Sequence, residues 1–295
     1  MSRGVLAALL FVFLWSTSFV PSRIAALEAP PLWFLVARFV SAALFFSVLA
    51  LVFRLRLPAT ARRWAALAAI GVFANAGYLG LSYEAFRHLS SAMGAIIACT
   101  NPLILAAVSP WLLRERLTRE KSLGMALGFG GVVMIMLSHA GSGSARPQDV
   151  LLAFAGVAAF VVATVLFKRL REPESLVVVS GSGFASAAIV LAPAAFALEG
   201  VPHVGNSGPL LASFIYLVIF LSIGTTLLWF WLLSHDEASR VSAYFFLAPV
   251  FGTAIGALLL HEPVYLHDAA GLASIVAGLV LVQRQPAAAG SPQAG

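Results

Sequence analysis

Charged residues are scarce in this chain of 295 residues, since Asp, Glu, Lys and Arg together make up only 10% of it. Soluble globular domains carry about 25% charged residues, which cover the surface that faces water. Hydrophobic residues instead make up 61% of the chain. This composition excludes an ordinary soluble exterior and indicates a protein whose surface faces lipid.

Other shortages narrow the possible functions. Cys99 is the single cysteine, so no disulfide forms within the chain, and its place in an apolar run predicts a packing role. The sequence has no G-x-x-x-x-G-K-[ST] stretch, which excludes ATP-driven pumping by this chain alone. The histidines are scattered over loops, and the spacing of His261 and His267 does not suit one helix face. We therefore expect no metal, no cofactor and no enzymatic activity.

Long apolar runs fill most of the sequence. A helix needs about 20 apolar residues to cross a bilayer, and backbone groups in lipid must be paired internally, so these runs predict transmembrane helices. The run after Arg3 resembles a signal peptide, but many similar runs follow, and we interpret it as the first membrane helix. Breaks at charged, proline and glycine clusters predict ten spans, at residues 4–24, 31–53, 64–83, 90–112, 119–138, 149–168, 174–197, 209–233, 239–260 and 267–283.

Basic residues are distributed unevenly between the two sides that these spans define. With the N-terminus inside, the inner segments carry 14 Lys and Arg residues and the outer loops carry 3, while Arg38 lies within a span. Cytoplasmic loops hold the Lys and Arg excess. We therefore expect both termini in the cytoplasm and the protein in the bacterial cytoplasmic (inner) membrane. Because the basic residues lie between apolar runs rather than in one patch, no nucleic-acid partner is expected.

Two prolines, Pro102 and Pro249, mark an internal duplication with an offset of 147 positions. Each lies near the middle of a long apolar run and predicts a hinge, because proline removes a backbone donor and interrupts a membrane helix. The first spans correspond less closely, near Trp15 and Phe160, with an offset of 145. The offset of 147 also relates Ala107 to Ala254, Glu115 to Glu262, Gly124 to Gly271 and Gly131 to Gly278.

The second copy is predicted to be upside down in the membrane. Each half has five predicted spans, an odd number, and the four basic residues of 114–121 are absent from the matching segment 261–268. Inverted-topology duplication is typical of secondary transporters. The fold class is therefore an all-α integral membrane protein with ten transmembrane helices in two inverted five-helix repeats. We expect these repeats at residues 1–140 and 147–285, and a disordered tail at 286–295.

Several short motifs follow one another along the chain in a defined order. They are Leu14-Trp15-Ser16-Thr17-Ser18-Phe19, Arg38, Pro102 followed by Arg114-Glu115-Arg116-Leu117-Thr118 and Gly124, and Pro249 followed by Glu262-Pro263 and Gly271. With these motifs the chain resembles the drug/metabolite transporter (DMT) superfamily, specifically its ten-helix EamA-type permeases. Among them it is most similar to the YddG-type aromatic amino-acid exporters. The resemblance implies a central cavity between the repeats, alternating access and export, and it fixes no substrate.

No Asp or Glu lies at mid-depth in a predicted span. Small four-helix relatives in this superfamily exchange cations for protons through a glutamate in the first helix, which this chain lacks. Selective transport of organic cations and proton coupling through a buried carboxylate are therefore disfavoured. We expect facilitated diffusion, or coupling through a less obvious group. Transport of phosphorylated sugars is also disfavoured, because only Arg38 is available as an embedded cation.

The candidate site residues are polar or aromatic side chains within or at the ends of the spans. Arg38 and Glu84 are predicted to form a gating or structural pair on the outer side, and a carboxylate ligand is the alternative role for Arg38. Trp and Tyr also form belts at membrane interfaces, and a membrane Asn can bond another helix, so each remaining candidate has a structural alternative. The candidates for substrate binding are Trp15, Ser18, Asn75, Tyr78, Thr100, Asn101, Trp229 and Tyr244.

These features predict a secondary transporter that exports small neutral or zwitterionic metabolites, with amino acids, and aromatic ones above all, favoured. The alternatives are a permease for purine, sugar-like or cationic compounds, or a pore or scaffold that is not a carrier. The expected partners are a small-molecule substrate and membrane lipid. We expect a monomer, with a dimer as the alternative.

Overall fold

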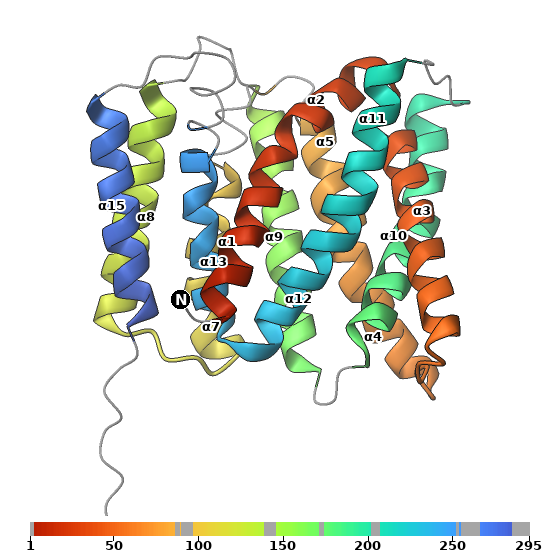
Figure 1. Cartoon of the computed structure of the whole chain (residues 1–295), viewed down its shortest axis with the longest axis horizontal. Helices are drawn as coiled ribbons and strands as arrows, with labels where there is room; N and C mark the ends of the chain where they lie inside the picture. The colour runs from red at the N-terminus through yellow and green to blue at the C-terminus, as the bar shows by residue number, and fades with distance from the viewer. Residues whose placement is uncertain are drawn as a thin grey trace, which may run out of the picture.

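The computed structural model describes residues 3–85, 89, 97–138, 146–170, 174–201, 207–251, 254 and 266–284. All regular elements in this part of the chain are helical, and most helices run roughly side by side (Figure 1). The elements are α1 (Arg3–Thr17), α2 (Phe19–Glu28), α3 (Pro31–Val52), α4 (Ala61–Gly71), η1 (Val72–Gly80), α5 (Leu81–Ala85), α7 (Asn101–Leu112), α8 (Arg119–Ser138), α9 (Pro147–Arg169), α10 (Leu176–Glu199), α11 (Gly208–Tyr216), η2 (Leu217–Thr225), α12 (Thr226–His235), α13 (Ala238–Ala243), η3 (Tyr244–Leu247) and α15 (Leu266–Gln283).

Where the structure describes the chain, its regular elements are all helices, and some are apolar and long enough to cross a membrane, as the sequence predicts. Shorter apolar helical stretches also occur, including Arg3–Thr17 and Asn101–Leu112. The number of ten membrane helices stays a prediction, because the spans predicted at 90–112 and 239–260 run partly outside the described residues. Among the described residues, five stretches have the length and hydropathy of a membrane span: Pro31–Val52, Ala61–Ala85, Pro147–Arg169, Leu176–Glu199 and Gly208–His235.

Several helices begin where the sequence supplies an N-terminal signal. Proline stands in the first turn of α3, α7, α9 and α11, where its missing N–H is not needed. Glu199, at the end of α10, accepts hydrogen bonds of 3.1 Å from the first backbone amides of α3. Glu115 accepts hydrogen bonds from the amides of Ala238 (2.7 Å) and Ser239 (3.2 Å), which begin α13. These carboxylates accept from backbone N–H groups that have no partner within the helix, and their negative charge is stabilised by the positive end of the helix dipole. They therefore link segments that are far apart in the sequence.

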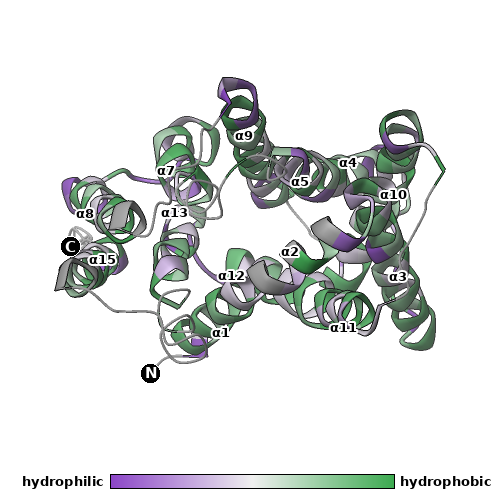
Figure 2. Ribbon diagram, turned by 90° about the horizontal axis from the view of Figure 1, so that it is seen from above, coloured by the Kyte–Doolittle hydropathy of each residue, from purple (hydrophilic) through white to green (hydrophobic). Residues whose placement is uncertain are grey.

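Glycines allow α8 and α15 to pack backbone to backbone at one end of the bundle (Figure 2). An ideal Cβ atom on Gly124 would lie 2.5 Å from the Gly278 carbonyl oxygen, and one on Gly131 would lie 2.5 Å from that of Gly271. The two helices therefore run antiparallel, at a separation that only small residues permit. The offset of 147 relates Gly124 to Gly271 and Gly131 to Gly278. If each glycine is replaced by its counterpart in the other copy, the contact of Gly124 with Gly278 becomes the contact of Gly271 with Gly131.

At the other end of the bundle α3 packs on α10 (Figure 2). The rings of Phe46 and Phe184 are stacked with centroids 6.1 Å apart, and the Phe39 ring lies 5.7 Å from Phe184. All three rings are at most 1% exposed. A Cβ atom on Gly181 would lie 3.0 Å from that of Phe46, so a small residue admits the ring. This aromatic core holds the two helices beside the cavity described below.

The connections after α3, α7 and α12 gather at one end of the molecule, the lower end in Figure 1. The guanidinium of Arg63 and the carboxylate of Glu174 form an ion pair of 2.8 Å. Lys121 pairs with Glu237, and Arg169 donates a 2.9 Å hydrogen bond to the carbonyl of Leu112. The basic segments predicted to face the cytoplasm thus share one end. Which side of a membrane that end faces stays a prediction.

Candidate functional site

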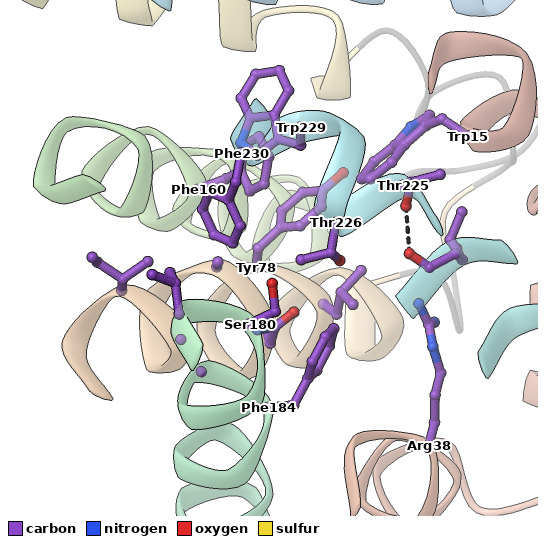
Figure 3. Close-up of a pocket in the computed structure, with 18 of the residues that line it drawn as sticks. Trp15, Arg38, Tyr78, Phe160, Ser180, Phe184, Thr225, Thr226, Trp229 and Phe230 are labelled. Carbon is purple, nitrogen blue, oxygen red and sulfur yellow. Dashed lines mark hydrogen bonds between the residues drawn. The ribbon is translucent and has the colours of Figure 1, made fainter. Parts of the chain in front are cut away.

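A cavity lies among α1, α3, α4, η1, α9, α10, η2 and α12, with about 640 Å³ of empty volume including its open mouth (Figure 3). Arg38 is the one charged side chain among the described lining residues, and none of these is a carboxylate. The lining residues are Phe11, Trp15, Arg38, Ile70, Gly71, Ala74, Asn75, Tyr78, Leu79, Phe160, Val179, Ser180, Gly183, Phe184, Leu221, Thr225, Thr226, Trp229 and Phe230. The cavity is therefore largely apolar with one cationic edge.

Four rings from four different elements meet in the wall, and we call Trp15, Tyr78, Phe160 and Trp229 the aromatic box. Trp15 is stacked on Tyr78 with an interplanar angle of 16° and centroids 6.0 Å apart. Phe160 lies 5.0 Å from Tyr78 and 5.3 Å from Trp229. Rings at such separations attract one another through their quadrupoles as well as by burial. The box is a preformed surface on which a flat apolar group can pack.

Two π-helices form opposite parts of the cavity wall. η1 begins at Val72 and η2 at Leu217, each has nine residues, and equivalent positions are 145 apart. Asn75 and Tyr78 on η1 and Thr225 on η2 line the cavity. π-Helices are rare, are mostly single-turn insertions, and are frequent at functional sites. The same unusual backbone thus occurs in both halves of the chain, next to the cavity.

Arg38 supplies the polar edge of the cavity. Its side chain is on α3, is 2% exposed, and donates from Nε to the Ser222 hydroxyl oxygen at 2.7 Å. The Tyr83 hydroxyl lies near the guanidinium, but neither Arg38 Nη1 nor Tyr83 Oη has hydrogen-bond geometry to a partner. The buried Ser180 hydroxyl, also in the lining, has no partner either. Buried polar groups are normally paired, so Arg38 Nη1 and Ser180 Oγ, whose residues line the cavity, are candidate partners for a polar ligand.

Four of the eight residues predicted to bind substrate line the cavity, namely Trp15, Asn75, Tyr78 and Trp229. The other four lie outside the lining of the described cavity. The Ser18 hydroxyl donates to the Trp15 carbonyl and the Thr100 hydroxyl to the Ile97 carbonyl, both at 2.6 Å. Asn101 and Tyr244 are buried, and Asn101 Oδ1 has no hydrogen-bond partner. Substrate binding by all eight residues stays a prediction.

The structure has irregular backbone just before both predicted hinges. Pro102 stands in the first turn of α7, directly after a turn at residues 99–100, and Pro249 follows the 3₁₀ segment η3. The hinge function of the two prolines is not tested by this geometry. Glu84 lies on α5, outside the described cavity lining, and follows Tyr83 in the sequence. The pair between Arg38 and Glu84 also stays a prediction.

Hydroxyl groups of the second half are the part of the site that sequence reasoning missed. Ser222 orients Arg38, while Thr225 and Thr226 line the cavity. The sequence does contain a sign of them, because these three hydroxyl residues lie within five positions of an otherwise apolar run. The sequence predicts Phe160 as the counterpart of Trp15 but does not predict it as a site residue. Ser180 carries no comparable signal, since serine is common in membrane helices where it bonds a carbonyl of its own helix.

The helical membrane fold and a buried, largely apolar cavity with one cation define an integral membrane protein that can hold a small solute. Comparison with known proteins gives the family. The pattern of the EamA-like transporter family matches residues 2–137 and 149–284, so the chain belongs to this family. The resemblance to the DMT superfamily is thereby confirmed.

Individual relatives share the full length of the chain. It is 27% identical over 288 residues to "Uncharacterized transporter YvbV" of Bacillus subtilis, covering 95% of this chain and 92% of that protein. It is 25% identical over 283 residues to "Probable amino-acid metabolite efflux pump" of Salmonella typhimurium, covering 93% and 92%. A crystal structure with 22% identity matches 96% of this chain and 97% of its own at a TM-score of 0.76, which shows a shared fold.

Proposed function

We propose that this protein is a secondary transporter that exports small neutral or zwitterionic metabolites, and favours amino acids with aromatic side chains. The observation that carries the proposal is the aromatic box next to the buried cation Arg38 in one cavity. Aromatic walls can hold an apolar side chain, and a few placed polar groups can orient the rest of a small ligand. The name of the Salmonella relative, an amino-acid metabolite efflux pump, supports the same substrate class.

The mechanism proposed is alternating access between two inverted five-helix repeats, at residues 1–140 and 147–285. The reciprocal contacts of Gly124 with Gly278 and of Gly131 with Gly271 support this, because a two-fold axis in the membrane plane requires such exchange. The π-helices at matched positions support it as well. Pro102 and Pro249 are proposed as the hinges, and both termini are proposed to face the cytoplasm.

Transport of purine, sugar-like or cationic compounds, and a pore or scaffold function, are the alternatives. The described lining disfavours cations, because Arg38 would repel them and no carboxylate of the lining would attract them. A pore usually has a continuous polar lining, whereas this lining is mainly aromatic and aliphatic. Both observations favour a carrier for an uncharged or zwitterionic solute.

Efflux from proteoliposomes tests the proposed function. Vesicles that contain the purified protein are loaded with radiolabelled L-phenylalanine, and efflux is followed with and without a pH gradient. We expect saturable efflux that needs no gradient, and stronger competition from tryptophan and tyrosine than from adenine, glucose or tetraphenylphosphonium. Efflux that depends strictly on the gradient would contradict facilitated diffusion. Inhibition by the cation alone would contradict the proposed substrate class.

A further inference from the structure

We infer that Arg38 binds the carboxylate of the transported molecule, and that the amino group of an amino acid is dispensable in this site. The site would therefore accept aromatic monocarboxylates as a class, with or without an amine. This inference rests on the proposed transport function and specifies which group of the substrate is recognised. It assigns to Arg38 the role of a ligand rather than that of one half of a latch.

The position of Arg38 suits an anion-binding residue. It lies seven positions after Pro31, so the helical rise places it about 10 Å along α3. At this depth a cation is costly and is usually functional. Its Nε atom is fixed by the 2.7 Å bond to Ser222, while Nη1 is buried without a partner. The guanidinium is thus oriented by the protein and keeps a donor available.

A carboxylate matches this donor in charge and in geometry. Guanidinium binds carboxylates through charge-assisted, often paired hydrogen bonds, and it is less strongly hydrated than an ammonium group. In the described part of the structure, the hydroxyl groups of Ser222 and Tyr83 approach the Arg38 guanidinium, and both are neutral. A ligand carboxylate would satisfy Nη1 and neutralise the buried charge at once.

The described cavity lining has a charged partner for the carboxylate of an amino acid, namely Arg38, but none for its amine. No described lining residue is Asp or Glu, so the lining side chains that an ammonium group would meet are hydroxyl groups, the Asn75 amide and the aromatic box. Such groups can tolerate an ammonium, since aromatic faces attract cations weakly. They do not compensate for its repulsion by Arg38 unless the same molecule also brings a carboxylate. The cavity therefore selects for the carboxylate and only tolerates the amine.

The cationic edge belongs to one copy of the repeat. At the offset of 145 that relates η1 to η2, the counterpart of Arg38 is Gly183. Gly183 also lines the cavity, where a Cβ on it would lie 3.1 Å from the Gly71 Cα, a tight contact with backbone. The second copy therefore presents no side chain at the position that corresponds to Arg38. A bound ligand would thus have one orientation, with its carboxylate towards Arg38 on α3 and its ring in the aromatic box. Figure 3 shows Arg38 and these rings in the lining of the same cavity.

Binding to the wild-type protein tests the substrate class without any variant. Trp15 and Trp229 line the cavity, so ligand binding in detergent can be followed by tryptophan fluorescence. The three probes share one ring: L-phenylalanine, 3-phenylpropionate, which lacks the amine, and phenethylamine, which lacks the carboxylate. We expect the two carboxylates to bind with similar affinity and phenethylamine to bind at least about tenfold more weakly. Equal or tighter binding of phenethylamine, or no binding of either carboxylate, overturns the inference.

Variants then test whether Arg38 is the ligand. A hydrogen bond to a charged group supports a loss of about ten- to a hundredfold in affinity for both carboxylates in Arg38→Gln. Arg38→Lys keeps the charge and should lose less, while affinity for phenethylamine should not fall in either variant. Arg56→Gln removes an exposed arginine of the α3–α4 connection and should bind like wild type. Unchanged carboxylate affinity in a folded Arg38→Gln protein overturns the assignment.

The latch with Glu84 is distinguished by exchange of the two charges. If Arg38 binds substrate, the double variant Arg38→Glu with Glu84→Arg should remain inactive, and rescue of efflux by the double variant overturns the inference. Failure of the proposed function gives a different pattern. In that case the wild type binds both carboxylates by fluorescence but moves neither across a vesicle membrane.

Discussion

Gly131 on α8 lies against Gly271 on α15 so closely that a Cβ on Gly131 would be 2.5 Å from the Gly271 carbonyl oxygen. The neighbouring Gly130 is exposed, and a Cβ there meets nothing within 4 Å. Two adjacent glycines of one helix therefore have opposite environments. One permits helix contact, and the other has no steric reason to be glycine.

Alanine substitution at these two positions should have opposite effects on stability. Gly131→Ala forces the helices apart, which should cost about 1–3 kcal/mol, as overpacking does elsewhere. Gly130→Ala should be neutral or stabilise by up to about 1 kcal/mol, because alanine is the better helix former. The measurement is the temperature at which each purified variant loses its monodisperse peak after heating in detergent. If both variants lose thermal stability to the same extent, the close contact between α8 and α15 does not contribute specifically to stability.

Trp229 should matter for transport, whereas Trp111 should not. Trp229 is 5% exposed within the aromatic box, and Trp111 is 80% exposed near the end of α7. Trp229→Leu keeps an apolar side chain but removes the ring, so we expect KM for phenylalanine efflux to rise about three- to tenfold. Trp111→Leu is the matched control and should keep the wild-type KM. The same rise in both variants would argue for a general effect of tryptophan loss rather than for ligand stacking.

Cysteine labelling tests the orientation of the protein in the membrane, that is, which end of the helix bundle faces the cytoplasm. Replacement of the buried Cys99 by alanine gives a background without cysteine. Arg56 and Arg146 are both exposed, and they lie at opposite ends of the bundle, after α3 and before α9. In intact cells an impermeant maleimide should label the Arg146→Cys protein, and it should label Arg56→Cys only after permeabilisation. The reverse pattern would place both termini outside.

Much of the fold can be predicted from the sequence, because the long apolar runs and the duplicated glycines have direct structural consequences. Apolar runs of about 20 residues predict helices wherever lipid is the solvent. The glycines at an offset of 147, such as Gly124 and Gly271, are recognisable from the sequence alone. What the sequence did not indicate is their antiparallel pairing, since the offset relates equivalent positions and does not say which residues touch.

The site was predicted only in part, for reasons that differ between residues. Trp15, Tyr78 and Trp229 lie in the lining because large rings in mid-span must pack against other side chains. Trp15 stacks on Tyr78, and Trp229 packs on Phe160. The π-helices η1 and η2 have no recognisable sequence pattern, since the extra residue in a turn depends on tertiary packing rather than on composition. Arg38 was identified, but its bond to Ser222 joins residues 184 positions apart and could not be read from spacing.

Counterflow separates a carrier from every alternative to it. Proteoliposomes are loaded with unlabelled L-phenylalanine and diluted into a trace of the labelled compound, and internal label is followed over time. A carrier that alternates the access of the cavity between Arg38 and the aromatic box will accumulate label transiently above its equilibrium level, and saturating outside substrate will abolish the overshoot. Label that only equilibrates, at a rate proportional to concentration, would contradict alternating access and indicate a pore.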